Sequence, residues 1–592
     1  MSGSLVLRTG LAIAALAVAS ALPAQVWRSD QGDGTYRNPV LFADYPDPDI
    51  IRVGEDFYFA TTTFANAPGI TILHSKDLVN WRIASHVIKQ LDGDPRYDLK
   101  EGGAYRHGFY AASLRHHDGL FTIAVTPVGH KTRIYRAARI EGPWTYKELD
   151  IEAFDPALFF DDDGTAYMGT SVGTDGTLTL LTLNKDLSAI AATRQAYYNK
   201  GAEGSKIIRH NGWYYLFNAI PSKLAMTVSR SRCLWGPWET RPSIDDKTGG
   251  HQGAIVDLPD GSWYGFVMVD AGAIGRMTNI SPIFWKDEWP VWGTPDAPDR
   301  VPDRSPKPIQ GLPFAEPDSS DDFSGPRLGL QWQWNHNPDD SRWSLTQHPG
   351  FLRLHATQAD GIWTARNTLT QKAQGPRARA VVKLDISGIR PGDVCGFGSF
   401  GKYSAQLSVV GGPKGTRGLQ MQLTESTSDG PRTQLRVPAR PIEGRALWLR
   451  TDMDFGAREG RVAYSLDNRR WTELGGAFPL AFDWRLPPAH SRSPPRRGAA
   501  TPGARRPRAP SPSGIANPPG NGPRHCPSAT VAWARCCSAD RRRSDCNSTR
   551  AASGPASPMI PSTRRLRRCC PRSARSSSRE KSRRPKPWPT KR

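Results

Sequence analysis

The chain has 592 residues, too many for one ordinary domain and enough for two domains with large cores. Its 56 Gly, 51 Pro and 19 Trp residues favour an all-β protein with many turns. The formal net charge of +22 would suggest a nucleic-acid-binding protein, but 25 of the 78 Lys and Arg residues lie in 486–592, against 3 of the 56 Asp and Glu residues. Residues 1–485 hold 53 of each sign and are neutral, which excludes a basic nucleic-acid-binding body.

The N-terminus carries the pattern of a secretory signal peptide. Arg8 precedes an apolar run at 11–24, and Ala19-Ser20-Ala21 fits a cleavage site between small residues. We expect 1–24 to be removed and the mature protein to be secreted or periplasmic. The run is too short to span a bilayer comfortably, and no later segment is apolar enough, so we expect no membrane partner.

Five segments in the first 300 residues share a polar turn with glycine followed by an aromatic-rich strand. They are VGEDFYFATTT (53–63), HHDGLFTIAVT (116–126), DDDGTAYMGTS (161–171), RHNGWYYLFNA (209–219) and LPDGSWYGFVM (258–268). A turn between two runs of β-formers predicts a hairpin. The turn glycines Gly54, Gly119, Gly164, Gly212 and Gly261 are 65, 45, 48 and 49 residues apart. A four-stranded repeat of this length is typical of a propeller blade, so we predict a five-bladed β-propeller over 34–300. An irregular β-sandwich is the alternative.

The repeat also predicts which residues lie near the propeller axis, because the strand before each turn is the innermost of its blade. Counting back from each glycine gives Asp47, Ala112, Asp155, Glu203 and His251. Carboxylates gathered on an axis raise one another's pKa, an arrangement that indicates function.

Three central carboxylates have the number and type that glycoside hydrolysis needs. One carboxyl must stay protonated to protonate the leaving oxygen, a second must be ionised to activate water or attack the sugar, and a third can orient and tune the first. Asp47, Asp155 and Glu203 fit these roles as a set, but the residue types do not assign the roles individually.

A resemblance to a known family adds the assignment. The matching segments are NPVLFADYPDPDIIRVGEDFYFATTTF (38–64), FDPALFFDDDGTAYM (154–168), GAEGSKIIRHNGWYYLF (201–217), GGHQGAIVDLPDGSWYGFV (249–267) and GAIGRMTNISPIFWKDEWPVWG (272–293). In this order they resemble glycoside hydrolase family 43, the β-xylosidases and α-L-arabinofuranosidases. The resemblance implies that Asp47 is the general base, Asp155 the residue that tunes the acid's pKa, and Glu203 the general acid, in a reaction that inverts the anomeric configuration. Asp49, two residues from Asp47 on the same face, is the competing candidate for the base.

The resemblance also implies sugar-binding residues. Phe64 corresponds to an aromatic residue that packs on the sugar, and Arg276 to an arginine that binds sugar hydroxyls. Tyr110 stands where the family usually has the Trp of Trp-Ala-Pro, so one wall of the sugar pocket differs here. His251 corresponds to a central histidine often associated with a water-coordinated calcium ion, a structural ion and not a required cofactor. The alternative for His251 is a hydrogen-bonded core histidine without an ion.

A second β-rich domain follows a Pro-rich linker at 301–320. Residues 321–485 resemble the concanavalin-like β-sandwich of a β-xylosidase-like branch of the family, in which a sandwich loop closes one side of the pocket. The sandwich ends short of its last strands, so we expect an exposed edge and low stability or aggregation.

The tail, 486–592, lacks apolar periodicity and is rich in Pro, Ser and Arg, so we expect disorder. We interpret it as translation out of frame; a basic nucleic-acid-binding arm and a cysteine or zinc framework are the alternatives. We expect an oligosaccharide substrate and no nucleic-acid partner, and the sequence leaves the oligomeric state open.

The functional prediction is an exo-acting glycosidase that releases terminal xylose or arabinose from xylan or arabinoxylan oligosaccharides. The sequence does not decide between the two sugars. Two alternatives stay open: a retaining, fructan-type five-bladed glycosidase and a non-catalytic sugar-binding propeller.

Overall fold

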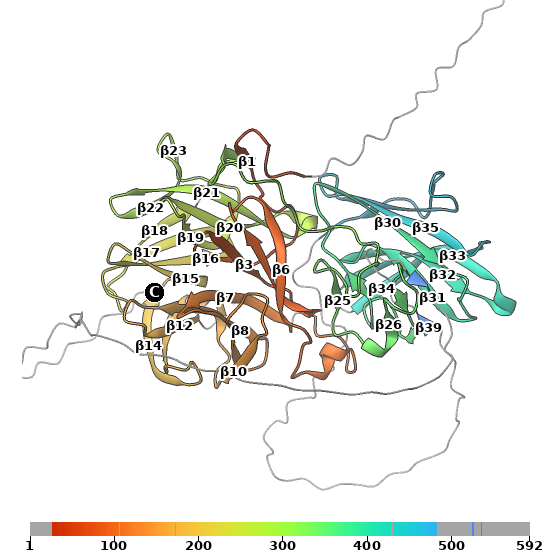
Figure 1. Ribbon diagram of the computed structural model, residues 1–592, viewed down its shortest axis with the longest axis horizontal. Coiled ribbons are helices and arrows are strands. Elements are labelled where there is room, and N and C mark those ends of the chain that lie inside the picture. Colours follow the sequence, from red (N-terminus) through yellow and green to blue (C-terminus); the bar gives the residue numbers. More distant parts are fainter. Residues whose placement is uncertain are drawn as a thin grey trace, which may run out of the picture. The chain divides into compact units, whose positions relative to one another are not determined.

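The computed structural model describes residues 27–481, except 106, 172, 245, 428 and 429, together with the backbone of 524–525 and 534–535. The predicted signal peptide lies outside these residues, as does all of the predicted tail except those two dipeptides. Strands predominate in the described part (Figure 1), so the predicted all-β class is confirmed. Its helices are short 3-10 turns: η1 (Pro95–Asp98), η2 (Gly173–Asp175), η3 (Pro221–Lys223), η4 (Gly272–Ile274), η5 (Asp340–Arg342) and η6 (Pro413–Gly415). No helix among the described residues is long and apolar enough to cross a membrane.

Five antiparallel sheets, each with strands in chain order, form the first domain. Blade 1 contains β2 (Asp49–Val53), β3 (Asp56–Thr61), β5 (Gly69–Ser75) and β6 (Trp81–Ile88). Blade 2 contains β7 (Phe109–His117), β8 (Leu120–Pro127), β9 (Thr132–Ala137) and β10 (Thr145–Leu149). Blade 3 contains β11 (Phe154–Phe160), β12 (Ala166–Ser171), β13 (Thr177–Leu183) and β14 (Ile190–Tyr198). Blade 4 contains β15 (Glu203–His210), β16 (Trp213–Ile220), β17 (Ala225–Ser231) and β18 (Glu239–Ile244). Blade 5 contains β19 (Gly250–Asp257), β20 (Trp263–Asp270), β21 (Arg276–Lys286), β22 (Trp289–Thr294) and β23 (Ala297–Pro298).

The first strands of these sheets contact one another in a closed ring, from β2 through β7, β11, β15 and β19 back to β2. This is the arrangement of a propeller, and the five sheets correspond one to one to the five repeats in the sequence. Each inner hairpin turns at the glycine expected there. All five glycines have positive φ, between 65° and 85°, a conformation that glycine adopts at no steric cost.

The ring is closed by the segment before blade 1. Strand β1 (Thr35–Arg37) pairs with β24 (Arg304–Pro306), which follows blade 5. Beyond β1, the Asn38 side chain donates to the carbonyls of Ile280 and Pro302, and the Val40 amide donates to the Thr278 carbonyl. The N-terminal segment therefore runs along β21 and joins the first and last blades.

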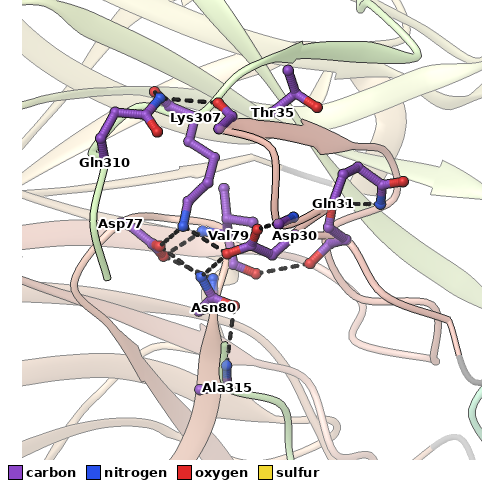
Figure 2. Close-up of polar contacts among 12 residues, drawn as sticks. Asp30, Gln31, Thr35, Asp77, Val79, Asn80, Lys307, Gln310 and Ala315 are labelled. Atoms are coloured by element: carbon purple, nitrogen blue, oxygen red, sulfur yellow. Dashed lines mark hydrogen bonds and ion pairs between the residues drawn. The ribbon is translucent and has the colours of Figure 1, made fainter. Parts of the chain in front are cut away.

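A buried cluster of charged side chains also joins the segment before blade 1 to the segment after blade 5 (Figure 2). The Lys307 ammonium lies 2.6 Å from Asp30 and 3.2 Å from Asp77, and the Asn80 amide donates to both carboxylates. The Asn80 side-chain oxygen accepts from the Ala315 amide, so the linker is bound as well. Burial alone would raise the pKa of Asp30, but the hydrogen bonds from Asn80 and Lys307 lower it.

We expect Lys307→Met to destabilise the fold by about 3–5 kcal/mol, because it leaves two buried carboxylates without their cation. Urea or thermal unfolding measures the change. Lys131→Met is the matched control, since Lys131 forms an exposed ion pair with Asp150 and should leave stability nearly unchanged. Equal midpoints for the two variants would contradict the structural role of the cluster.

The second domain is a sandwich of two sheets around its own buried core. One sheet contains β28 (Thr357–Gln358), β39 (Arg524–His525), β31 (Asp393–Gly398), β32 (Tyr403–Gly411), β33 (Arg417–Thr427) and β34 (Gly430–Pro441). The other contains β37 (Thr472–Glu473), β36 (Glu459–Ser465), β35 (Ala446–Asp454), β30 (Arg377–Asp385), β40 (Ala534–Arg535) and β38 (Phe478–Pro479). A short hairpin adds β26 (Trp343–Ser344) and β27 (Arg353–Leu354).

The two domains are joined through a strand close to the propeller channel. Strand β25 (Gln333–Asn335) pairs with β4 (Asn66–Ala67) of the propeller and with β29 (Leu369–Thr370). Next to β25, the buried His336 ring accepts from the Ala104 amide at 2.8 Å. Because β4 begins two residues after Phe64, this contact holds a predicted sugar-binding residue against the second domain.

Candidate active site

The inner strands enter the channel through a shared β-bulge. In blade 2 Tyr110 pairs with Thr126 and Ser113 with Ala124, so two residues of β7 stand opposite one residue of β8. The same count holds between Phe154 and Ala157 in β11 and between Glu203 and Lys206 in β15. A bulge redirects side chains at the end of a strand, and here it directs them toward the axis.

One residue at the axial end of each blade has left-handed backbone; in blades 2 to 5 it lies inside the register shift of the inner strand, and in blade 1 it precedes β2. These residues are Asp47 (φ 55°), Ala111 (φ 41°), Asp155 (φ 45°), Gly204 (φ 61°) and Gln252 (φ 55°). The equivalence predicted from the sequence is therefore partly wrong: Ala111, not Ala112, corresponds to the two aspartates, and Glu203 and His251 lie one residue earlier. The reason is that the turns differ in length: residues 118–119 join β7 to β8, whereas 161–165 join β11 to β12, so the count from a turn glycine to the axis is not constant.

Asp47 is a buried carboxylate with its own cation. It is 4% exposed, and its Oδ1 accepts from the Arg276 guanidinium at 2.9 Å. Its Oδ2 accepts from the Thr62 hydroxyl at 2.5 Å, and that hydroxyl accepts in turn from the Ala111 amide. The carboxylate is thus held from three blades.

Asp49 has a different environment from Asp47. Its Oδ2 accepts from the Leu114 amide at 2.8 Å and from Arg115 at 2.9 Å, and the Lys206 ammonium lies 3.5 Å away. These partners engage the carboxylate inside the blade wall. The geometry favours Asp47 over Asp49 as the residue that acts on a ligand.

Asp155 and Glu203 are half-buried and have strongly raised pKa values. Burial, and then the negative charge of Asp47, raises the pKa of Asp155 to about 7, against the effects of Lys206 and the Gly204 amide. Burial, followed by the charges of Asp155 and Asp47, raises the pKa of Glu203 to about 8. The fold therefore brings the three carboxyl groups together: Asp47 is in an ion pair, Asp155 titrates near neutral pH, and Glu203 keeps its proton at neutral pH.

Aromatic side chains and an arginine border this cluster. The rings of Phe64 and Tyr110 pack edge to face at 5.0 Å, and the Arg276 guanidinium lies over Phe64 at 5.5 Å. Phe64 and Tyr110 also line a pocket of about 300 Å³ that extends to the sandwich residues Trp363 and Phe400. The predicted sugar-binding residues thus lie together beside a cavity of the size that small ligands occupy.

The comparisons with known proteins agree with this arrangement. The family model described as "Glycosyl hydrolases family 43" matches residues 36–290, and the model described as "Beta xylosidase C-terminal Concanavalin A-like domain" matches residues 320–483. A relative from Xylanibacter ruminicola, described as a putative beta-xylosidase, is 35% identical over 470 residues, which cover 76% of this chain and 85% of the relative. A beta-xylosidase from Formosa agariphila is 30% identical over 521 residues, with 76% and 86% coverage.

The chain belongs to glycosyl hydrolases family 43. Solved structures support the membership. An engineered family 43 hydrolase, described as having both endo-xylanase and exo-arabinofuranosidase activity, is 29% identical with a TM-score of 0.70, and the match covers 77% of this chain and 95% of that one. The family 43 protein BlXynB from Bacillus licheniformis is 28% identical with a TM-score of 0.66, with 75% and 91% coverage. The protein is a glycosidase with a propeller and a concanavalin-like sandwich.

The calcium ion implied by family 43 finds no set of protein ligands among the described residues. Calcium takes six to eight oxygen ligands. Buried His251 instead offers a ring whose Nδ1 lies 2.9 Å from the Gly249 carbonyl and whose Nε2 lies 3.8 Å from Asp270. No group of three or more His, Cys, Asp or Glu side chains in the described part could hold a metal. A fully water-coordinated ion stays a prediction.

Two residues of this family 43 site escaped the sequence analysis. Thr62 holds Asp47, and its signal was the run of threonines at 61–63 that ends β3. Lys206, with a side chain 3% exposed, faces Asp49 and lowers the pKa of Asp155. A buried lysine three residues after Glu203 had no local signal, because its partners come from other blades.

Proposed function

We propose that this protein is an exo-acting hydrolase that releases single terminal xylose or arabinose units from hemicellulose oligosaccharides, with inversion at the anomeric carbon. The proposal depends on the different environments of the three carboxyl groups: Asp47 is in an ion pair, whereas Asp155 and Glu203 have raised pKa values. Glycoside hydrolysis requires carboxyl groups of different proton affinity, since it needs an ionised base and a protonated acid at the same pH.

Each carboxyl group has a role that follows from its surroundings. Asp47 removes a proton from water as the water oxygen attacks the anomeric carbon. The bond to the leaving oxygen breaks, and that oxygen takes the proton of Glu203. Asp155, which shares the cluster and accepts from the Gly204 amide at 3.1 Å, holds β15 in place and tunes the pKa of Glu203. Arg276 and Phe64 bind the terminal sugar.

The substrate class is supported by the relatives. Proteins from Formosa agariphila and Xylanibacter ruminicola are described as a beta-xylosidase and a putative one, and a Bacteroides ovatus protein, 31% identical over 369 residues, as a non-reducing end alpha-L-arabinofuranosidase. The pocket beside Phe64 and Tyr110, about 300 Å³ in volume, has room for a pentose. Because relatives of both kinds match, either sugar is compatible with the site.

Release of p-nitrophenol from its β-D-xyloside and α-L-arabinofuranoside tests the proposal. We expect turnover of at least one of them, and the ratio of the two kcat/KM values identifies the sugar. Binding of xylo-oligosaccharides without turnover of any substrate would favour a non-catalytic sugar-binding propeller.

The pH dependence tests the role of Asp155. Glu203 acts only when protonated, so its raised pKa keeps the enzyme active up to about pH 8 and activity falls above that value. In Asp155→Asn the negative charge that raises the pKa of Glu203 is removed, so the alkaline limb of kcat/KM should move to lower pH. Profiles of both proteins measure the shift. An unchanged limb, or a shift to higher pH, would contradict the coupling.

We also infer that the protein is exported. The inference depends on the basic n-region, the apolar run and the small-residue cleavage site within 1–24. Mass determination of protein recovered from the culture medium or periplasm should give a chain lacking this segment, whereas intact protein in the cytosol would contradict export.

A further inference from the structure

The wall of the pocket carries two opposite charges that the mechanism above does not use. Asp44 lies three residues before Asp47, and Lys372 follows β29 in the second domain. Both side chains line the pocket of about 300 Å³ together with Phe64 and Tyr110. They come from different domains and meet at the same cavity.

Asp44 is fixed by its contact with the chain at Arg276. Its Oδ1 accepts from the Arg276 amide at 2.8 Å. The neighbouring Gly275 has φ 105°, and a Cβ there would lie 2.4 Å from the same oxygen, so the close approach requires glycine. The second oxygen, Oδ2, accepts no hydrogen bond from any described residue, and the side chain lines the pocket. Asp44 thus presents a rigid acceptor to a ligand.

Lys372 presents a cation to the same space. Its ammonium lies 5.3 Å from the centroid of the Tyr45 ring, and it makes no hydrogen bond or ion pair with the residues that the structure describes. Burial and the charge of Arg276 lower the pKa of Lys372, while the charge of Asp44 raises it. The two groups are close enough to interact electrostatically, yet they are not within the 4.0 Å of an ion pair.

We propose that Asp44 and Lys372 together bind one hydroxyl group of the terminal sugar. A hydroxyl donates one hydrogen bond and accepts others, so it can donate to Asp44 and accept from Lys372 where the two charges do not touch. Arg276 places this pair next to the reacting sugar, since its guanidinium contacts Asp47 and its amide contacts Asp44. This inference rests on the proposed function and names two specificity residues for it.

The consequence is discrimination among pentoses. A site built around a hydroxyl rejects a sugar that lacks it or directs it elsewhere, because the charged partners are then left without a ligand. A pyranose and a furanose direct their hydroxyls differently. Asp44 and Lys372 should therefore contribute to the preference for one of them.

The test compares kcat/KM of the full-length wild-type enzyme with that of the variants Lys372→Met and Asp44→Asn. The substrates are the p-nitrophenyl glycoside of the preferred pentose and its monodeoxy analogues, each of which lacks one hydroxyl group. We expect each variant to lose about 10- to 100-fold on the parent glycoside, the value of a hydrogen bond to a charged group. On the analogue that lacks the bound hydroxyl, each variant should have nearly the same kcat/KM as the wild type, because the contact is already missing. This analogue should be the same one for both variants, as a double-mutant cycle between enzyme and substrate requires. An unfolded fraction of a variant lowers its kcat/KM on every substrate by the same factor, so it cancels in the ratio of the kcat/KM values on two substrates.

Lys383→Met is the matched control, since the Lys383 ammonium also lies 5.3 Å from an aromatic centroid, that of Trp448, but does not line the pocket. It should leave the ratios between substrates unchanged. Equal losses on the parent and all deoxy analogues, or no loss on any, would overturn the inference while the wild-type enzyme still turns over its substrate. A wild-type enzyme without any turnover would overturn the proposed function itself.

Discussion

Glu203→Gln should lower kcat/KM on a xylo- or arabino-oligosaccharide by about 10²- to 10⁴-fold, the usual contribution of a general acid. Glutamine keeps the size of the side chain but has no carboxyl proton to give, so a sugar must leave as an unprotonated alkoxide. A leaving group such as 2,4-dinitrophenolate needs no proton, and its glycoside should lose far less. Steady-state kinetics on the two substrates measures the difference.

The dependence on the leaving group separates the role of Glu203 from a general loss of structure. An inactive fraction of enzyme lowers both rates by the same factor. The alkaline limb near pH 8 should also disappear from the variant, since the group that titrates there has been replaced. Equal losses on both substrates, with the limb retained, would contradict the assignment of the acid.

Asp47→Asn should lower kcat by about 10²- to 10⁴-fold on every substrate, whatever its leaving group, because water must be deprotonated in each reaction. The amide oxygen of asparagine can still accept from Arg276, while its NH2 group faces the Thr62 hydroxyl, which can turn to accept from it. The loss therefore reports the missing base more than a missing contact. Substrate binding should persist, and KM or calorimetry checks it.

Asp49→Asn is the matched comparison two residues away. Asp49 forms ion pairs with Arg115 and the buried Lys206. Its replacement should lower the free energy of unfolding by roughly 3–5 kcal/mol, because both cations lose their partner, but it should lower kcat far less than Asp47→Asn does. A loss of kcat in Asp49→Asn as large as that in Asp47→Asn would contradict the assignment of the base.

The sequence predicted the propeller because its signals are local. Each turn glycine is followed within three residues by an aromatic β-former, and the hairpins form at Gly54 and its four counterparts. The sequence also predicted that Asp47, Asp155 and Glu203 lie together, since one inner strand per blade must start near the axis. The exact register was not found: Ala112 was taken for Ala111 because the inner turns differ in length from blade to blade, and the strand ends leave no mark in the sequence.

The partners of the carboxylates were beyond prediction for a different reason. Arg276 is 229 residues from Asp47, and Lys206 reaches Asp49 from blade 4. Asp47 and Asp49 look alike in sequence, and only the contacts made across blades separate them. The pKa values of Asp155 and Glu203 likewise follow from burial and from each other's charge, which depend on the closed ring.

The anomeric configuration of the first sugar released tests the central claim most directly. If Asp47 activates water while Glu203 protonates the leaving oxygen in one displacement, proton NMR of early turnover should show the inverted anomer, α-xylose from a β-xyloside, before mutarotation. Release of β-xylose first would mean a double displacement through a sugar bonded to the enzyme, and would contradict the roles given to these carboxylates.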